Sequence, residues 1–225
     1  MNWFFKSFTY SVGKKLIMGA TGLFFVIFLL EHVAGNFLLF ADDGGVEYNL
    51  YSHELTHNVI IGPIVKLIEI LLFSSFIIHI IDGTTLWIQN RRARPNGYVM
   101  NKRSQNSKWT SRNMMLSGGV LFIFLVIHLG TFFVPYRFTD SVPNLYQRVH
   151  DEFQSPLFTG FYVFSMVFLS LHLQHGFSSA FQTLGMNNPK YYPFLKKLGL
   201  VLSILISAGF AAQPLYFLFF DALHN

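Results

Sequence analysis

Five apolar runs, each long enough to cross a lipid bilayer, constrain the fold of this chain more than any other feature. A helix needs about 20 apolar residues to cross the hydrocarbon core, and the runs cover residues 16–40, 59–89, 114–136, 156–184 and 198–220. Of the 225 residues 52% are hydrophobic and only 12% are charged, about half the charged fraction of a soluble domain. The sequence therefore predicts an all-α membrane protein with five transmembrane helices in a single integral membrane domain, residues 1–225.

The first apolar run follows two lysines, as the apolar part of a signal peptide would. It is longer than such a segment, lacks a small-residue cleavage site and contains Glu31 and His32. We therefore expect it to remain in the mature protein as the first span.

Charged residues divide the connections between the spans into two classes. Basic residues precede the first span and fill the second and fourth connections: Lys6, Lys14, Lys15, Arg91, Arg92, Arg94, Lys102, Arg103, Lys108, Arg112, Lys190, Lys196 and Lys197. The other two connections are acidic, with Asp42, Asp43, Glu47, Glu54, Asp140, Asp151 and Glu152. Because basic loops stay in the cytoplasm, we expect a cytoplasmic N-terminus and an outer C-terminus. The positive charge is thereby explained without nucleic-acid binding.

Four of the nine histidines lie well inside apolar runs, one in each of the first four spans: His32, His79, His128 and His172. Ionisable side chains inside a membrane are rare and usually functional. Because successive spans run in opposite directions, His32 and His128 are expected nearer the outer end, and His79 and His172 nearer the cytoplasmic end. At a rise of about 1.5 Å per residue, the sequence predicts two pairs about 10–15 Å apart along the membrane normal.

Two histidine pairs at two depths are typical of a protein that binds two haems. A six-coordinate haem iron takes a neutral imidazole on each side, and it then carries electrons because no position is open for oxygen chemistry. The chain has no cysteine, which excludes thiolate metal sites and cysteine-ligated clusters. Gly35, Gly83 and Gly176 follow their histidines by about one turn, as close packing around a macrocycle requires. The alternative is that each histidine is a hydrogen-bonded contact between helices.

The segment HELTH, residues 53–57, fits the zinc-protease pattern of two histidines four residues apart. That pattern requires a helix and a third ligand. We expect the segment to lie in the connection between the first two spans, where the next helix only begins, and His150 and Asp140 stand at no recognisable spacing from it. We therefore assign neither histidine of this segment a metal.

Four segments resemble the cytochrome b subunit of succinate dehydrogenase and fumarate reductase, in its single-polypeptide form with five spans and two haems. They are GKKLIMGATGLFFVIFLLEHVAGN, IIHIIDGTTLW, VIHLG and LHLQHGFSSAFQTLG, and they extend over essentially the whole chain. The resemblance implies that the first four spans form a bundle around two b haems. It implies iron ligation by His32 and His128 in the distal haem, and by His79 and His172 in the proximal haem.

His175 competes with His172 for the fourth ligand position. We prefer His172 because the family places one glycine four residues after the ligand and another nine residues further on, where Gly176 and Gly185 stand here. The chain departs from some diheme fumarate reductases at Ser170, where those proteins carry a glutamate for proton transfer. The chain therefore lacks the glutamate of that route.

The resemblance implies a membrane anchor and electron-transfer subunit of succinate:quinone oxidoreductase, in the tricarboxylic acid cycle and electron transport of a bacterial cytoplasmic membrane. A flavoprotein subunit with FAD and an iron–sulfur subunit would dock on the cytoplasmic face. Dicarboxylate chemistry would belong to the flavoprotein, so this chain would carry no dicarboxylate active site. Quinone, with menaquinone favoured, would be the substrate in the membrane. The resemblance is also compatible with a dimer of the complex.

Two acidic residues are candidates for quinone chemistry. In menaquinol-oxidising members a glutamate in the connection between the first two spans serves the distal quinone site, and Glu54 looks like its counterpart. Glu69, in the second span, is the other candidate, although its spacing from Lys66 also fits a simple ion pair.

Two other classes of function would use the same histidines. A histidine-lined transporter or proton channel would need no haem. Another diheme quinol-oxidising cytochrome b, of the bc type, carries two ligands on each of two helices, whereas here four spans contribute one each.

Overall fold

The computed structural model describes residues 10–93, 112–139 and 144–220. All regular structure in these ranges is helical, and five helices are long and apolar enough to cross a membrane. They cover Val12–Phe40, Ile61–Arg92, Met114–Phe138, Pro156–Thr183 and Tyr192–Phe219. The predicted all-α fold with five apolar helices of membrane length is confirmed, and these helices fit a multi-pass membrane protein.

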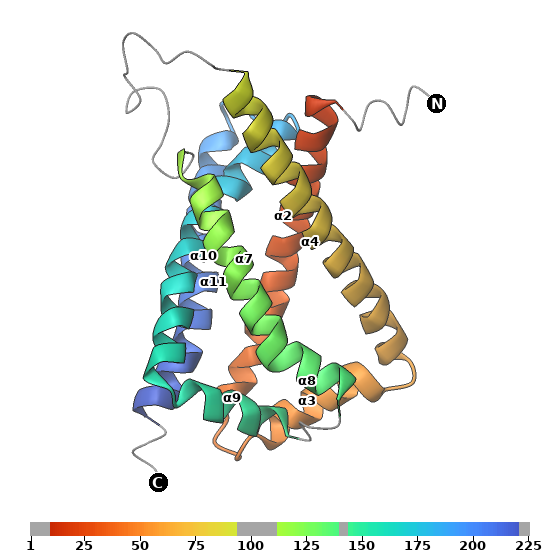
Figure 1. Ribbon diagram of the computed structural model, residues 1–225, viewed down its shortest axis with the longest axis vertical. Helices are drawn as coiled ribbons and strands as arrows, with labels where there is room; N and C mark the ends of the chain where they lie inside the picture. Colours follow the sequence, from red (N-terminus) through yellow and green to blue (C-terminus); the bar gives the residue numbers. More distant parts are fainter. Residues whose placement is uncertain (1–9, 94–111, 140–143, 221–225) are drawn as a thin grey trace.

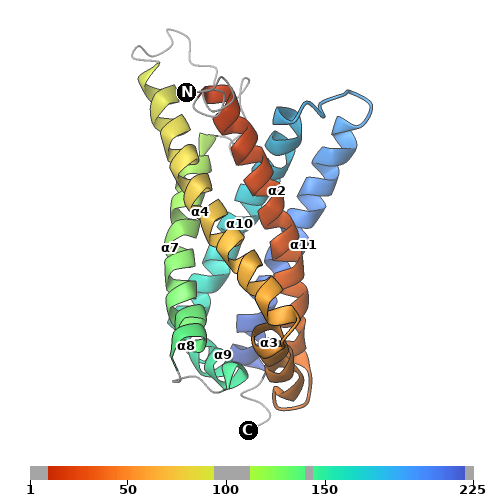
Figure 2. The same cartoon turned by 90° about the vertical axis from the view of Figure 1, so that its right-hand side faces the viewer.

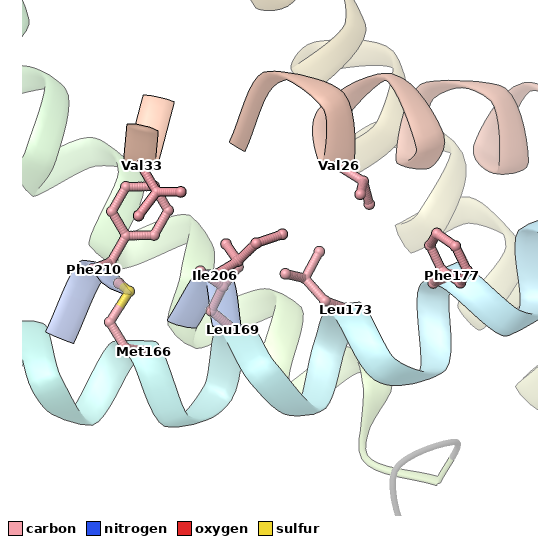
Figure 3. Packing of buried hydrophobic residues seen from close by; sticks show 8 residues of the cluster. All are labelled: Val26, Val33, Met166, Leu169, Leu173, Phe177, Ile206 and Phe210. Atoms are coloured by element: carbon pink, nitrogen blue, oxygen red, sulfur yellow. The ribbon is translucent and has the colours of Figure 1, made fainter. Parts of the chain in front are cut away.

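The long helices run back and forth between the two ends of the molecule (Figures 1 and 2). They are α2 (Ser11–Asn36, continued by the 3-10 turn Phe37–Phe40), α4 (Ile61–Arg92), α7 (Met114–His128), α10 (Pro156–Thr183) and α11 (Tyr192–Phe219). Helix α10 packs against α11, α2 and α7, and α4 packs against α2 and α3. Figure 3 shows the resulting core, formed by Val26, Val33, Met166, Leu169, Leu173, Phe177, Ile206 and Phe210.

Helix α4 is the least covered of the long helices. Gly62 is its only buried residue, and apolar side chains such as Ile64, Leu67 and Ile70 are more than half exposed. A monomeric soluble protein rarely exposes so large an apolar surface, whereas lipid tails accept it. The exposure of α4 therefore agrees with a helix that faces lipid.

Two short helices, which the sequence patterns did not predict, lie in the outer connections expected from the distribution of charge. They are α3 (Val46–His57) and α9 (Leu145–Phe153), and both lie at the end of the molecule where α11 ends (Figures 1 and 2). Asn49 joins them, because its Nδ2 donates to Asn144 Oδ1 at 2.9 Å and its Oδ1 accepts from Tyr146 N at 3.0 Å. The HELTH segment therefore lies in the connection between the first two spans, as expected, but it lies on a helix of its own, which the sequence patterns did not predict.

The third span is not one regular α-helix. A π turn, Leu129–Phe133, separates α7 from α8 (Val134–Phe138), and Val134 N–H donates to Leu129 O five residues earlier. Pro135 has no N–H to donate to the Thr131 carbonyl. Arg148 Nε from α9 donates to that carbonyl instead, at 3.3 Å.

Basic and acidic side chains separate toward opposite ends of the helices. Lys14 and Lys15 begin α2, Arg91 and Arg92 end α4, and Lys196 and Lys197 lie in the first turns of α11. The opposite end carries α3 and α9, with Glu47, Glu54, Asp151 and Glu152. Most of the basic second connection, residues 94–111, lies outside the described residues, as do Lys6 and Asp140.

Candidate functional site

The structure brings the four span histidines together in two pairs. The rings of His32 on α2 and His128 on α7 have centroids 5.9 Å apart and planes at 86°. The rings of His79 on α4 and His172 on α10 have centroids 6.5 Å apart and planes at 59°. Each pair therefore brings together imidazole rings from two spans.

The two pairs lie at different levels along the helices. Thr21 Oγ1 on α2 is 2.9 Å from Nδ1 of His79, and His32 follows Thr21 by eleven residues, or about 16 Å along the helix. On α10, the Tyr162 hydroxyl is 2.8 Å from Nδ1 of His128, and His172 follows Tyr162 by ten residues, or about 15 Å. The separation is about half the thickness of a bilayer core.

Hydroxyl groups determine which nitrogen of His79 and His172 carries the proton. Thr21 Oγ1 also lies 2.8 Å from a backbone carbonyl oxygen one turn earlier, which can only accept. When the single hydroxyl proton goes to that carbonyl, Nδ1–H of His79 donates to Thr21. Ser117 does the same for His172, with its Oγ 3.0 Å from a carbonyl and 3.1 Å from Nδ1. Both imidazoles thus keep a lone pair on Nε2, as a metal ligand requires.

The pair His32 and His128 lies among aromatic rings. Phe28 stacks on His32 with centroids 5.3 Å apart, and Phe124 stacks on His128 at 5.6 Å. His128 has the Tyr162 hydroxyl at Nδ1, whereas His32 makes ring contacts but no hydrogen bond to another described residue. This pair is oriented mainly by packing.

The donor set of each pair fits a haem iron. Two imidazoles on opposite sides of an iron, each bound at about 2 Å, have ring centroids about 6 Å apart, close to the observed 5.9 and 6.5 Å. Ligating histidines commonly use their second nitrogen for a hydrogen bond, and three of the four have a hydroxyl there. The described ranges hold no group of three His, Cys, Asp or Glu side chains suited to a metal ion. Two imidazoles per site suit a metal whose remaining ligands come from a macrocycle.

Two glycines that sequence reasoning missed face the pair His79 and His172. A Cβ on Gly22 would lie 3.8 Å from Cε1 of His79, and a Cβ on Gly118 would lie 3.6 Å from Cε1 of His172. Both glycines belong to neighbouring helices, so no local spacing rule relates them to their histidine. Only the packing of α2 and α7 identifies them.

Gly35, expected to make room for a macrocycle, makes room for Tyr51 of α3 instead. A Cβ at Gly35 would lie 2.6 Å from the Tyr51 hydroxyl, which donates to Glu31 Oε1 at 2.6 Å. Burial, and then the hydrogen bond to Glu31, raise the pKa of Tyr51 above its usual value. Gly176 has no atom within 4 Å of the equivalent position.

The two candidate glutamates lie in different surroundings. Glu54 is exposed on α3 and accepts from Asn58 Nδ2 at 2.9 Å. Glu69 accepts from Arg137 Nη2 of α8 at 3.0 Å, and both side chains are largely buried, with 23% and 14% exposed. Its ion pair is thus with Arg137 and not with Lys66, as the spacing in the sequence suggested.

The HELTH segment meets one requirement of a zinc protease. It is helical, and the rings of His53 and His57 stack with centroids 4.4 Å apart. A third protein ligand is not found in the described part of the chain. His150 is hydrogen-bonded to Asp151 at 3.0 Å instead.

No protein-family model matches the chain, and neither a curated protein nor a solved structure matches it. The four sequence segments and the paired histidines therefore carry the likeness to a known family.

Proposed function

We propose that the chain is the membrane-anchor and electron-transfer subunit of a succinate:quinone oxidoreductase. It would carry electrons between an iron–sulfur subunit and quinone through two b haems, each held by two histidines. The observation that carries the proposal is the pairing of four intramembrane imidazoles at two levels, with ring separations of 5.9 and 6.5 Å. A transporter without haem would not require this spacing.

The residues of the chain orient the ligands and keep water away from them. His79 and His172 would hold the proximal haem and His32 and His128 the distal one, and a bound haem supplies one-electron transfer with no open position on the iron. Thr21 and Ser117 hold the first two imidazoles through Nδ1. Phenyl rings and the Tyr162 hydroxyl hold the second pair.

Quinone exchange needs protons as well as electrons, and Glu54 is the candidate that the surroundings favour. It lies exposed on α3, at the acidic end of the molecule, and His32 lies nearer to that end of α2 than Thr21, the partner of His79, does. Glu69 is engaged in the ion pair with Arg137, which joins α4 to α8. We therefore give Glu54 the proton-handling role at the distal quinone site and Glu69 a role in joining α4 to α8.

The basic end of the molecule would face the cytoplasm and the soluble subunits. The chain has no cysteine, so single cysteines report orientation directly. Val46→Cys on α3 should react with an impermeant maleimide in intact cells, whereas Asn187→Cys should react only after the membrane is opened. The reverse labelling pattern would invert the proposed topology.

The decisive measurement is the haem content of the protein purified from membranes. Pyridine-haemochrome analysis should give two b haems per chain, and flavoprotein and iron–sulfur subunits should copurify. A preparation with all its protein folded and no haem would support the transporter or proton-channel alternative. A single haem would contradict the pairing.

A further inference from the structure

The exposed histidines at the end of α3 have no part in the proposed electron path. His53 and His57 lie four residues apart, so they share one face of the helix, and their rings stack nearly parallel, with planes at 11°. Both side chains are exposed. The end of α3 therefore presents two imidazoles to the outer solvent.

A neighbouring hydroxyl sets the tautomer of His57. Thr56 Oγ1 lies 3.0 and 3.1 Å from two backbone carbonyl oxygens and 2.7 Å from Nδ1 of His57. Carbonyl oxygens only accept, so when the hydroxyl proton goes to one of them, Nδ1–H of His57 donates to Thr56. Nε2 of His57 is left with its lone pair, as in His79 and His172 of the candidate haem site.

We propose that His53 and His57 form a two-ligand site for a late first-row divalent cation, with water completing the coordination. Imidazole suits Zn²⁺, Ni²⁺ and Cu²⁺, and two histidines four residues apart on a helix can share one such ion. Acidic residues on the same end, such as Asp42 and Glu47, raise the local concentration of cations. A bound ion of this kind needs no third protein ligand, so the site differs from that of a zinc protease.

The site also has a consequence for Glu54. An ion shared by His53 and His57 would place positive charge beside that carboxylate and would cross-link the last turn of α3. The binding site itself does not depend on haem or on quinone chemistry, so its test is separate from that of the proposed function.

Metal titration of the purified protein, carrying an affinity tag without histidine, tests the site. Isothermal titration at pH 7.5 should show one site, with Cu²⁺ bound more tightly than Ni²⁺ or Zn²⁺ and Mn²⁺ weakest. The electron paramagnetic resonance spectrum of bound Cu²⁺ should show two nitrogen ligands. Affinity should fall as the solution is made more acidic, because protonated imidazole does not bind metal.

Variants of α3 show whether the two imidazoles act together. His53→Ala and His57→Ala should each weaken binding by about 100-fold, because joining two ligands in one site gains about 10²–10⁴-fold. The double variant His53→Ala, Leu50→His keeps two histidines but separates them by seven residues, and Leu50 is 59% exposed, so it should bind as weakly as His53→Ala. Wild-type affinity in either single variant, or recovery in the double variant, would overturn the proposal.

Discussion

The two histidine pairs use the same side chain and orient it in different ways. Hydroxyl groups on α2 and α7 hold His79 and His172 through Nδ1. His32 and His128 lie among Phe28, Phe124, Phe132 and Phe210. The first arrangement fixes the proton of each ring, whereas the second relies on aromatic packing with a single hydroxyl partner, Tyr162.

This difference shows how one chain can tune two similar sites separately. Hydrogen bonds to a ligand and the polarity around it both shift a haem potential. The pair among aromatic rings also lies nearer α3 and its carboxylates. Changes to one level should therefore leave the other largely intact, and the following predictions test that independence.

Loss of a ligand should have the largest effect. His79→Ala or His172→Ala should remove the proximal haem alone, and His32→Ala or His128→Ala the distal haem alone, so each variant should retain about half the wild-type haem by pyridine-haemochrome analysis. Redox titration identifies which haem remains. If His32→Ala and His79→Ala lost the same haem, the two-level arrangement would be wrong.

Glu54→Gln should separate electron transfer from proton transfer at the distal end. The amide keeps the shape but cannot titrate, so quinone-linked turnover should fall tenfold or more, since general acid–base catalysis contributes about 10²–10⁴-fold. Haem content and haem reduction by succinate should stay near normal. Glu47→Gln, a matched change on the same helix, should turn over quinone normally. Normal turnover in Glu54→Gln would show that Glu54 is a solvated side chain with no part in proton transfer.

Removing a hydroxyl partner should weaken one site only. Thr21→Val should lower haem affinity at the proximal level by about 10–100-fold, the usual effect of losing such a partner, and Tyr162→Phe should do so at the distal level. Haem transfer to apomyoglobin measures both. Ser178→Ala is the control, because that hydroxyl bonds only to backbone carbonyls. An equal loss of haem affinity at both levels in Thr21→Val would argue against independent sites.

Gly35→Ala should have the smallest effect. The added methyl group would displace the Tyr51 ring and break its hydrogen bond to Glu31, at a cost of about 1 kcal/mol. The thermal unfolding midpoint should fall, with little change in haem content. Gly160→Ala is the control: Gly160 lies on an exposed face with no atom within 4 Å of an added Cβ, so this change should be neutral or slightly stabilising. An unfolding midpoint of Gly35→Ala equal to that of the wild type would show that Tyr51 is not held at Gly35.

Local sequence patterns predicted the spans well because hydropathy is a property of each segment alone. The main error is at the start of the fifth span, predicted at residue 198 and found at Tyr192. Pro193 fits the first turn of a helix, and the exposed Lys196 and Lys197 extend that helix beyond its apolar run. The partners of the histidines could not be predicted, since Thr21, Ser117 and Tyr162 lie on other helices and only tertiary packing pairs them.

The π turn after His128 changes the direction in which the rest of the third span points. Nine residues separate His128 from Arg137, which in a regular α-helix at about 100° per residue would lie on opposite faces. The turn absorbs one extra residue, so the angle between the two falls to about 80°. One span can thus direct an imidazole toward α2 and, about two turns later, a guanidinium toward Glu69 on α4. Pro135 and its neighbours in the π turn therefore fix, together, how the third span packs against α2 and how it packs against α4.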